Sequence, residues 1–563
     1  MFINSYAPFG AEGIIIRVEA DIRRGIPGVD ITGLAEGAVR EARERVRAAF
    51  RNSGYTFPPD RILINLAPAG LRKEGAALDL PIALAVMAAA GLAPSTDNLM
   101  VMGELELSGS VRPVRGVLAA VDAGLKADIR DFIVPAENAR EAAILAGCRV
   151  AAAATLQEAL HALIVRAETG SLPVSDFSAG EGAVPAVPAW GEFSQVRGQG
   201  RYKRALEIAA AGGHNLLVFG PPGAGKTMLA RNLPSIMAPL TPAESVEVTR
   251  LYSLAGQIDA GQGSAAGVFP SDPPGNPCLI THPPFRSPHH SASAEGILGG
   301  GKSVRPGEIS LAHYGVLFLD EAPEFRSNVL QALREPLEDQ VITISRAEGP
   351  VRLPAEFQLL LAANSCPCGR LGLREPGAAS DGGGMGGALG CFCSPEEVSR
   401  YWRKFGSALL DRIELRVAVV PPDVAQMEKG GEESGAEIAK RVQRAVEIQR
   451  ERLRGLTPGG EAAAINTSGA SYRRNARIPA GMVEPCCPLT DRGSRAFREA
   501  LAKLGLSGRA YHGILRVART IADLEGRSSI DADHILEAVQ YRRQGDDPYD
   551  ILLGKDTVRT AWL

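Results

Sequence analysis

Apolar positions in the first part of the chain alternate between short runs and a longer amphipathic stretch. The runs GIIIRVEA (13–20) and RILINLAP (61–68) have the length and the β-branched content of strands. The stretch between them places four apolar side chains on one helical face, namely Val39, Ala42, Val46 and Phe50. Gly54 then marks the end of this helix. The pattern predicts one α/β domain over residues 1–165.

The rest of the chain divides into a linker, a second α/β domain and a helical region. Residues 166–195, rich in Ala, Gly, Pro and Ser, are typical of a linker. Residues 196–420 alternate strand and helix patterns, which predicts a parallel sheet, with a Pro/Gly/His-rich interruption over roughly 255–310. Residues 421–563 lose the strand pattern. We expect helices there near 436–455, 490–504, 508–525 and 531–543.

The composition is that of folded globular domains, because 45% of the 563 residues are apolar and 22% are charged. No apolar run approaches the ~18 residues that cross a membrane. The N-terminal segment also lacks the basic start and long apolar run of a signal peptide. We therefore expect a cytoplasmic protein without membrane contact. A formal net charge of −3 means that any contact with nucleic acid requires local basic patches.

The strongest chemical signal is a glycine-rich segment between an apolar strand (215–219) and a helix (228–233). Its residues fit G-x-x-x-x-G-K-[ST], and they are Gly220, Pro221, Pro222, Gly223, Ala224, Gly225, Lys226 and Thr227. Such a loop turns backbone N–H groups toward the phosphates of a nucleotide, and the helix start adds positive potential. We expect Lys226 to reach the β- and γ-phosphates of ATP and Thr227 to bind Mg²⁺.

Two further strands bring polar residues to the same edge of the expected sheet, where ligands bind in open parallel sheets. The apolar strand over 315–319 ends at Asp320 and Glu321. We expect Asp320 to bind Mg²⁺, directly or through water, and Glu321 to polarise the attacking water. The strand over 358–363 ends at Asn364, which either orients this water or occupies an ordinary turn. Its position favours the first role.

Two arginines are candidates for stabilising the transferred phosphate. Arg412, in the segment LLDRI, is placed to touch the γ-phosphate of a neighbouring subunit. The alternative for Arg412 is a surface ion pair with Asp411. Arg509 begins a helix after Ser507 and is expected to reach the γ-phosphate of its own subunit. The alternative for Arg509 is an exposed arginine at a helix start.

Four of the eight cysteines form two C-x-C pairs at the ends of a glycine-rich insertion. The pairs are Cys366 with Cys368 and Cys391 with Cys393. Four thiolates at such spacing favour a closed tetrahedral Zn²⁺ site, although C-x-C is a less common half-site than C-x₂-C. The alternative is four reduced cysteines in a reducing compartment. The remaining cysteines are expected to be structural, and they are Cys148, Cys278, Cys486 and Cys487.

Two other segments of the second domain carry unusual side chains. The sequence QVITISRAEGPVRL (340–353) has the pattern of a β-hairpin whose turn is flanked by Arg346 and Arg352. The sequence FRSPHH contains the adjacent His289 and His290. Because adjacent side chains rarely face one site, packing or subunit contact is favoured over metal binding for this pair.

Several segments resemble those of the Mg-chelatase-like AAA+ ATPases. They are GPPGAGKT, FRSPHHSAS, PGEISLAHYGVLFLDE, LREPLEDQ, CPCG, LLDRI and GRAYHGILRVARTIADLEG. Nearly the whole chain, in the same domain order, resembles the ComM/YifB family. The resemblance implies a P-loop AAA+ parallel sheet over 196–420 with a helical lid over 421–563, the cofactors ATP and Mg²⁺, and hexamers with ATP between subunits. It puts Asn364 at sensor 1, Arg412 at the arginine finger and Arg509 at sensor 2.

The N-terminal domain resembles the Lon-type proteolytic domain, an α+β fold of the ribosomal S5 type. The segment KEGAA (73–77) matches the one that carries the serine nucleophile of Lon, and here Ala77 stands at that place. The segment VRGVLAA (114–120) matches the one that carries the lysine of Lon and contains none. Since alanine cannot act as a nucleophile, the resemblance implies a retained fold without protease activity.

For the whole chain, the family resemblance implies DNA branch migration in recombination and natural transformation. In this clade the hairpin over 340–353 points into the pore of the ring, so Arg346 and Arg352 would contact DNA without sequence preference. The alternative is a chelatase motor that drives Mg²⁺ insertion into a tetrapyrrole through a partner subunit. The Lon-like domain favours the DNA motor. A third alternative, an ATP-dependent protease, is disfavoured by the missing serine and lysine.

Overall fold

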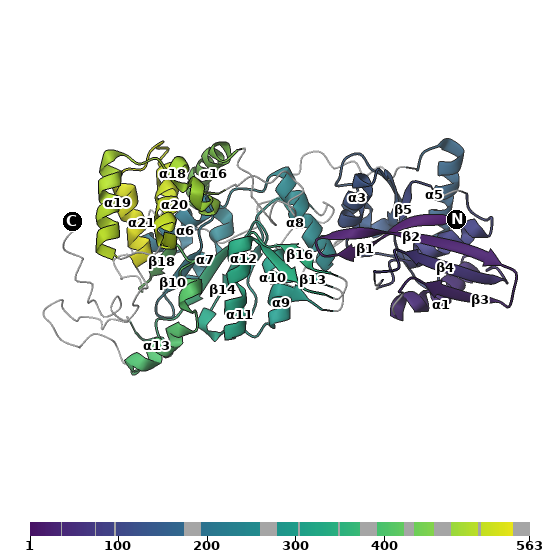
Figure 1. The fold of residues 1–563 in the computed structure, drawn as a ribbon, viewed down its shortest axis with the longest axis horizontal. Coiled ribbons are helices and arrows are strands. Elements are labelled where there is room, and N and C mark those ends of the chain that lie inside the picture. The colour runs from purple at the N-terminus through teal and green to yellow at the C-terminus, as the bar shows by residue number, and fades with distance from the viewer. Residues whose placement is uncertain are drawn as a thin grey trace.

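The structure is a computed structural model. It describes residues 1–34, 37–71, 73, 75–94, 97–173, 193–258, 279–301, 304–346, 349–371, 391–420, 433–454, 474–504 and 508–543. Most of the expected linker, Cys278 and Ser507 lie outside these residues. The described residues form an elongated molecule, with the N-terminal domain at one end and the C-terminal helices at the other (Figure 1). No helix among them is both long and apolar enough to cross a membrane.

The N-terminal domain is built on a mixed sheet of seven strands. In sheet order they are β3 (Gly28–Thr32), β4 (Arg61–Ala67), β2 (Glu12–Arg23), β1 (Phe2–Phe9), β5 (Leu99–Val101), β8 (Asp131–Pro135) and β9 (Arg149–Ala153). β1, β2 and β4 pair antiparallel, and the other neighbours pair parallel. The sheet is therefore of the expected α+β type, and both predicted strands are found in it.

Five helices accompany this sheet in the described residues. They are α1 (Gly37–Asn52), α2 (Asp79–Ala89), α3 (Val117–Lys126), α4 (Ala139–Ala142) and α5 (Leu156–Thr169). The apolar face predicted for α1 is buried, since Val39, Ala42 and Phe50 have no exposed surface and Val46 has 2%. The helix α5 continues past the boundary predicted at residue 165. A short hairpin of β6 (Glu104–Leu105) and β7 (Val111–Arg112) completes the domain.

The central domain contains a parallel sheet of five strands, as the sequence predicts. In sheet order they are β11 (Phe285–Arg286), β14 (Val316–Leu319), β17 (Gln358–Ala363), β10 (Leu216–Phe219) and β18 (Leu415–Ala418). All four pairings are parallel. The residues of β10, β14 and β17 are fully buried, which explains their continuous apolar sequences. All carboxyl ends of the strands meet at one edge of the sheet.

The helices of the central domain surround this sheet (Figure 1). They are α6 (Gly200–Gly212), α7 (Lys226–Arg231), α8 (Pro242–Ala255), α9 (Ala294–Leu298), α10 (Glu308–Leu311), α11 (Ser327–Ala332), α12 (Arg334–Asp339), α13 (Pro395–Arg403) and α14 (Ser407–Leu410). Capping boxes define the starts of two of them. Thr241 and Glu244 cap α8, and Ser394 and Glu397 cap α13.

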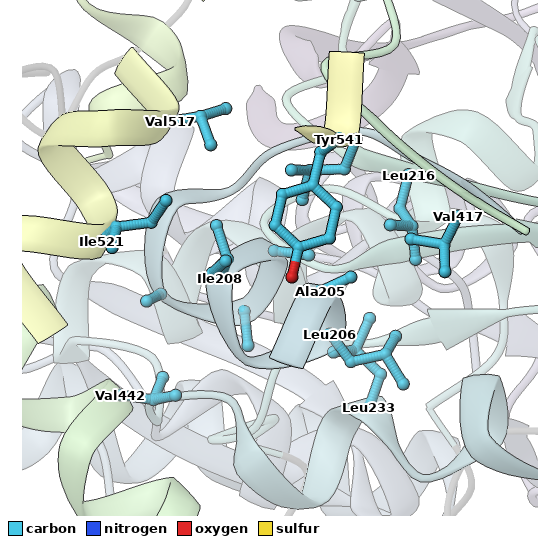
Figure 2. Close-up of a cluster of buried hydrophobic side chains, with 14 of the residues drawn as sticks. Ala205, Leu206, Ile208, Leu216, Leu233, Val417, Val442, Val517, Ile521 and Tyr541 are labelled. Atoms are coloured by element: carbon cyan, nitrogen blue, oxygen red, sulfur yellow. The ribbon is translucent and has the colours of Figure 1, made fainter. Parts of the chain in front are cut away.

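The C-terminal region is helical, as predicted, and packs on the central domain through one hydrophobic core. Its helices are α16 (Gly435–Arg452), α18 (Val483–Cys486), α19 (Asp491–Leu504), α20 (Gly508–Leu524) and α21 (Ala532–Arg543). Figure 2 shows Ala205 and Ile208 of α6 among side chains of the sheet and of these helices, including Val442, Ile521 and Tyr541. Cys486 and Cys487 belong to this core, which fits their predicted structural role.

The helix α8 joins the central domain to the N-terminal domain. Its Ser253 hydroxyl donates a hydrogen bond to Glu141, which also accepts one from the Leu118 backbone N–H at 2.9 Å. Its Arg250 forms an ion pair with Asp122 at 2.9 Å. These contacts bury charged groups with partners from both domains, so they fix the two domains against each other.

The predicted hairpin over 340–353 is confirmed as β15 (Val341–Ile344) and β16 (Val351–Pro354). It touches the N-terminal domain, because a Cβ placed on Gly10 would lie 2.9 Å from Val351 Cγ1 and 3.1 Å from the Arg352 carbonyl oxygen. Gly10 also has a φ of +71°, so glycine suits both the turn and the close approach. A second small ribbon is formed by β12 (Gly299–Gly300) and β13 (Arg305–Pro306).

Candidate nucleotide-binding site

The glycine-rich loop runs from the end of β10 to the start of α7, which is the context that its motif requires. Gly223 and Gly225 have φ values of +77° and +82°, in the left-handed region that glycine adopts without strain. A Cβ on Gly220 would lie 2.2 Å from the Val419 carbonyl oxygen. The glycines therefore allow both the turn of the loop and its close packing on the end of β18.

Lys226 is buried at the base of this loop. Its ammonium group donates hydrogen bonds to the carbonyl oxygens of Gly220 and Pro221, both at 2.8 Å, and to Asn364 Oδ1 at 3.2 Å. Burial lowers the pKa of Lys226 to about 8, against the opposing charges of Asp320 and Glu321. The ammonium group is thus held in the loop that is expected to enclose the phosphates.

Gln199, just before α6, also contacts the glycine-rich loop, and no pattern in the sequence indicated this. Its side-chain amide donates to the Ala224 carbonyl at 3.1 Å and to the Val420 carbonyl at 2.5 Å. Its backbone φ of +58° is unusual for a residue other than glycine. Gln199 therefore ties the glycine-rich loop to the end of β18. A lone glutamine before a helix carries no sequence pattern that announces this role.

The predicted oxygen ligands of Mg²⁺ lie together. The Thr227 hydroxyl donates to Asp320 Oδ2 at 2.8 Å, so two oxygens from α7 and the end of β14 face each other. Hydroxyl and carboxylate oxygens are the donors that Mg²⁺ prefers, and the residues present therefore fit this cation. Asn364 follows β17 and bonds to Lys226, which places it beside the loop rather than in an isolated turn.

Glu321 follows Asp320 in a left-handed conformation, with φ +48°. Its backbone N–H donates to Asp320 Oδ1 at 2.9 Å, and its carbonyl accepts from the Glu324 N–H at 2.7 Å. This tight turn fixes the backbone and leaves the carboxylate 58% exposed at the edge of the sheet. A carboxylate in this position is suited to polarise a water molecule.

The two candidate arginines lie at the opposite edge of the sheet. Arg412 and Arg509 both pair with Glu338 of α12, and the Arg509–Glu338 distance is 2.6 Å. The carbonyl of Arg412 accepts from the Asn215 side chain, just before β10 begins, whereas the glycine-rich loop follows the other end of β10. Four strand residues separate these edges by roughly 13 Å.

The assignment of Arg509 to the γ-phosphate of its own subunit stays a prediction. Among the described residues Arg509 pairs with Glu338 of α12 rather than with the glycine-rich loop. The cause is the packing of α20 on α6, which directs the start of α20 toward α12, a tertiary effect that no local pattern shows. In the described contacts Arg412 pairs with Glu338, and Asp411 pairs with Arg542. Arg412 and Arg509 thus lie side by side at the edge of the sheet opposite the glycine-rich loop.

The four C-x-C cysteines converge on one point, as predicted. Three of their Sγ···Sγ distances are 3.4 Å (Cys366–Cys368), 3.8 Å (Cys366–Cys391) and 3.6 Å (Cys368–Cys391). All four sulfur atoms lie within 4.8 Å of one another. A tetrahedron of four sulfurs at ~2.3 Å from Zn²⁺ has edges of about 3.8 Å. The donor set therefore fits a zinc ion.

The cysteine cluster is packed against the nucleotide loop. Its segment begins directly after Asn364, and a Cβ on Gly369 would lie 3.1 Å from Pro222 Cδ. Trp402 of α13 donates its indole N–H to the Ser365 carbonyl at 3.1 Å. The same ring meets Phe219, the last residue of β10, edge to face with centroids 5.2 Å apart. The loop that carries the cysteines is thereby fixed beside the strand that leads into the phosphate-binding turn.

The remaining predicted site residues lie apart from the glycine-rich loop. Arg346 donates a hydrogen bond to the Gly301 carbonyl, and Arg352 stands on β16 opposite Thr343. In the N-terminal domain, Lys73 is fully buried and donates to the Gly33 carbonyl at 3.0 Å. The segments that correspond to the serine and lysine of Lon supply Ala77 and the start of α3, which offer no catalytic pair.

Comparison with protein families gives three matches that together span most of the chain. Residues 192–427 match the family described as magnesium chelatase, subunit ChlI. Residues 18–138 match subunit ChlI of Mg-chelatase, and residues 432–542 match the C-terminal region of the ChlI subunit. With the parallel sheet, the glycine-rich loop and the two carboxylates described above, these matches define a Mg-chelatase-like AAA+ ATPase.

Relatives of similar length narrow this class. The chain is 38% identical over 550 residues to YifB of Salmonella typhimurium, with 96% of each chain covered. It is 36% identical over 546 residues to the competence protein ComM of Haemophilus influenzae, with 96% and 97% covered. The chain belongs to the ComM/YifB family. Lon protease 2 of Bacillus subtilis matches 30% of this chain at 25% identity, over 34% of its own length.

Proposed function

We propose that this chain is the subunit of a hexameric, ATP-driven ring that remodels branched DNA. The observation that carries the proposal is the division of catalytic groups between the two edges of one sheet. Lys226, Asp320 and Glu321 lie at one edge, and Arg412 and Arg509 lie together at the other. A site completed by a neighbouring subunit joins these two halves, and a closed ring repeats the junction at every interface.

At this interface each residue has a definite task. Lys226 and the glycine-rich backbone bind the phosphates, and the oxygens of Thr227 and Asp320 hold Mg²⁺, which supplies positive charge to the phosphate oxygens. Glu321 accepts a proton from the attacking water, and Asn364 orients that water. Arg412 and Arg509 come from the neighbouring subunit. Their ion pairs with Glu338 break, and both guanidinium groups then contact the γ-phosphate.

The element proposed to engage DNA is the hairpin of β15 and β16. Arg346 and Arg352 flank its turn, and β16 rests against the N-terminal domain near Gly10. Arginine contacts to phosphate carry no sequence information, so binding depends on the shape of the DNA and weakens with salt. The N-terminal domain then acts as a scaffold that supports the hairpin from outside the ring.

A junction assay tests this proposal. We expect a four-way DNA junction to stimulate ATP hydrolysis and to be migrated, and Lys226→Ala to lose both activities. The double substitution of Arg346 and Arg352 by Ala should keep basal ATP hydrolysis, flatten the salt dependence of binding and abolish migration. Matched replacement of Arg495 and Arg498 on the exposed face of α19 should change none of these.

Wild-type migration by the hairpin variant would exclude the hairpin as the DNA-engaging element. The next candidates would be the basic segments 197–204 and 472–477, although residues 472 and 473 lie outside the described part of the chain. The magnesium chelatase description of the matching families favours one alternative, a motor that drives Mg²⁺ insertion into a tetrapyrrole. Failure of every DNA structure to stimulate hydrolysis, with stimulation by a chelatase partner subunit, would establish that alternative instead.

We also propose that the four cysteines hold a structural zinc ion. The sulfur distances support it, and the cluster is closed by protein ligands alone, as in structural sites. Elemental analysis of purified protein should give about one Zn per chain, and Cys391→Ser should lose the metal and lower the thermal midpoint. Cys148→Ser, at a cysteine outside the cluster, is the matched control. Metal-free wild-type protein of unchanged stability would exclude the site.

A further inference from the structure

The short strand β11 brings a histidine to the catalytic edge of the sheet. β11 pairs with β14 in parallel register, with Phe285 opposite Val316 and Arg286 opposite Leu317. His290 and Glu321 each lie four residues beyond the paired residues Arg286 and Leu317. Residues that follow paired parallel strands lie at the same edge of the sheet. Accordingly, His290 Nδ1 lies 3.7 Å from Glu321 Oε2.

The segment that carries His290 is anchored on both sides. Arg286 is buried and forms two hydrogen bonds with Glu308, both at 2.7 Å, which fix the end of β11. After it, the His289 carbonyl accepts from the Ala292 N–H at 2.9 Å, and the His289 ring bonds to the Ser291 hydroxyl at 2.8 Å. Contacts of other residues therefore hold the loop in place, independently of the His290 side chain.

The ring of His290 is oriented by two aromatic neighbours. It lies against His289 with centroids 4.0 Å apart and meets the edge of Phe325 at 6.5 Å. Phe325 belongs to the turn that follows Glu321, so the ring and the carboxylate share one frame. With this support, Nδ1 faces the carboxylate while the side chain of His290 keeps 39% of its surface exposed.

We propose that His290 is a positioning residue for Glu321. The backbone of Glu321 is fixed by its tight turn, but its exposed side chain retains several rotatable bonds. Contact with the imidazole restricts the carboxylate to orientations in which it faces the edge of the sheet, where the attacking water is expected. His290 touches neither phosphate nor water in this scheme. The inference rests on the proposed catalytic role of Glu321.

Steady-state ATP hydrolysis of three histidine variants tests the inference. His290→Ala should lower kcat about tenfold, the rate equivalent of one lost orienting contact, with KM and the Kd for a fluorescent ATP analogue unchanged. His290→Asn should recover most of the rate, because its amide nitrogen stands near the position of Nδ1. His161→Ala, at an exposed histidine of α5 in the N-terminal domain, should behave as wild type.

A double-mutant cycle separates positioning from general damage to the fold. In the Glu321→Gln background, His290→Ala should cause no further loss of the residual rate, since the group that it orients is gone. An equal loss in both backgrounds, a raised Kd in place of a lowered kcat, or an Asn variant as slow as the Ala variant would each overturn the inference. Full activity of Glu321→Gln alone would instead overturn the catalytic role of Glu321.

Discussion

Lys73 in the N-terminal domain and Lys226 in the central domain are both buried and both donate hydrogen bonds to backbone carbonyls. Burial lowers the pKa of each. They differ in what surrounds them. Lys226 also bonds to Asn364 and feels the charge of Asp320, at a sheet edge that is open to a ligand. For Lys73 the partners are the carbonyls of Gly33 and Pro68 within its own domain.

The carboxylates of the two domains show the same contrast. Asp79 is fully buried and receives two hydrogen bonds from Arg45, at 2.7 and 2.9 Å, so its oxygens serve the fold. Glu321 keeps most of its surface exposed beside the glycine-rich loop. Asp79 is thus enclosed within the N-terminal domain, whereas Glu321 is kept accessible at the catalytic edge of the central sheet. A buried charge alone does not mark a reactive site, whereas charges that converge on an accessible edge do.

The largest expected effect comes from replacing each of the two lysines in turn. Lys226→Ala should abolish tight ATP binding, because it removes the cation that faces the phosphates. Lys73→Met should leave nucleotide affinity unchanged. Glu321→Gln should bind ATP normally and hydrolyse it about 10³-fold more slowly, since only the water-activating group is lost. Equilibrium binding and single-turnover hydrolysis measure both steps. Equal loss of binding in the Lys226 and Glu321 variants would contradict this division.

The second prediction concerns the opposite edge of the central sheet. Arg412→Ala should retain ATP binding and lose about 10³-fold in turnover. Mixing Arg412→Ala with Glu321→Gln subunits should restore part of the activity, because each supplies the half-site that the other lacks. Arg509→Ala should fall in the same complementation group as Arg412→Ala. A mixture without activity at every ratio would argue against sites shared between subunits.

The third prediction tests the enclosed network of the N-terminal domain. Asp79→Ala should lower stability by about 3 kcal/mol, because it leaves Arg45 without its buried partner. The exposed pair of Asp30 and Arg61 is the matched control, and Asp30→Ala should cost less than about 1 kcal/mol. Thermal unfolding measures both. A strong loss of nucleotide affinity in the Asp79 variant would break the distinction between the domains.

Two buried glutamates, Glu141 of α4 and Glu247 of α8, give the smallest expected effect. Burial raises the pKa of Glu141, whose neutral partners include Ser253. Burial alone would also raise the pKa of Glu247. The contact with His313, whose Nε2 lies 3.3 Å from Glu247 Oε1, together with Arg250 and the Tyr314 hydroxyl, outweighs burial and lowers this pKa to about 2. The two glutamates therefore contribute to stability with opposite dependence on pH.

For Glu247 the folded pKa is below the unfolded one, so its contribution to stability is complete above about pH 4.5 and disappears as the pH falls toward 2. The contribution of Glu141 has the opposite sign and declines as the pH rises above its unfolded pKa. Between pH 6 and 3 the thermal midpoint of Glu247→Gln should fall by about 5 °C less than that of wild type. The exposed Glu499→Gln is the control, and identical slopes for Glu247→Gln and wild type would refute the assignment.

Much of the fold is predictable because its elements have strong local patterns. The strands β10, β14 and β17 are continuous apolar runs, and the residues that follow them had to meet at one edge once a parallel sheet was inferred. For this reason Lys226, Asp320 and Asn364 could be placed together from sequence. The convergence of Cys366 and Cys391 was predictable from paired spacing in the same way.

The features that escaped prediction depend on tertiary packing. The position of Arg509 is set by how α20 lies on α6, which no spacing reveals. The contact of His290 with Glu321 depends on the register of β11, a strand of two residues that is too short to show a pattern. Gln199 acts through a single side-chain amide that joins two distant loops. Such contacts become visible only when the sheet is assembled.

The position of Trp402 has a practical optical consequence. Trp402 is 7% exposed, its ring packs edge to face with Phe219, and its indole N–H donates to the Ser365 carbonyl. The other two tryptophans, Trp190 and Trp562, lie outside the described residues. Replacing both by Phe would leave Trp402 as the single tryptophan of the chain. It lies between β10, which leads into the phosphate-binding turn, and the segment at Ser365, which leads to the cysteines. Its fluorescence would report movement of either one without an added dye.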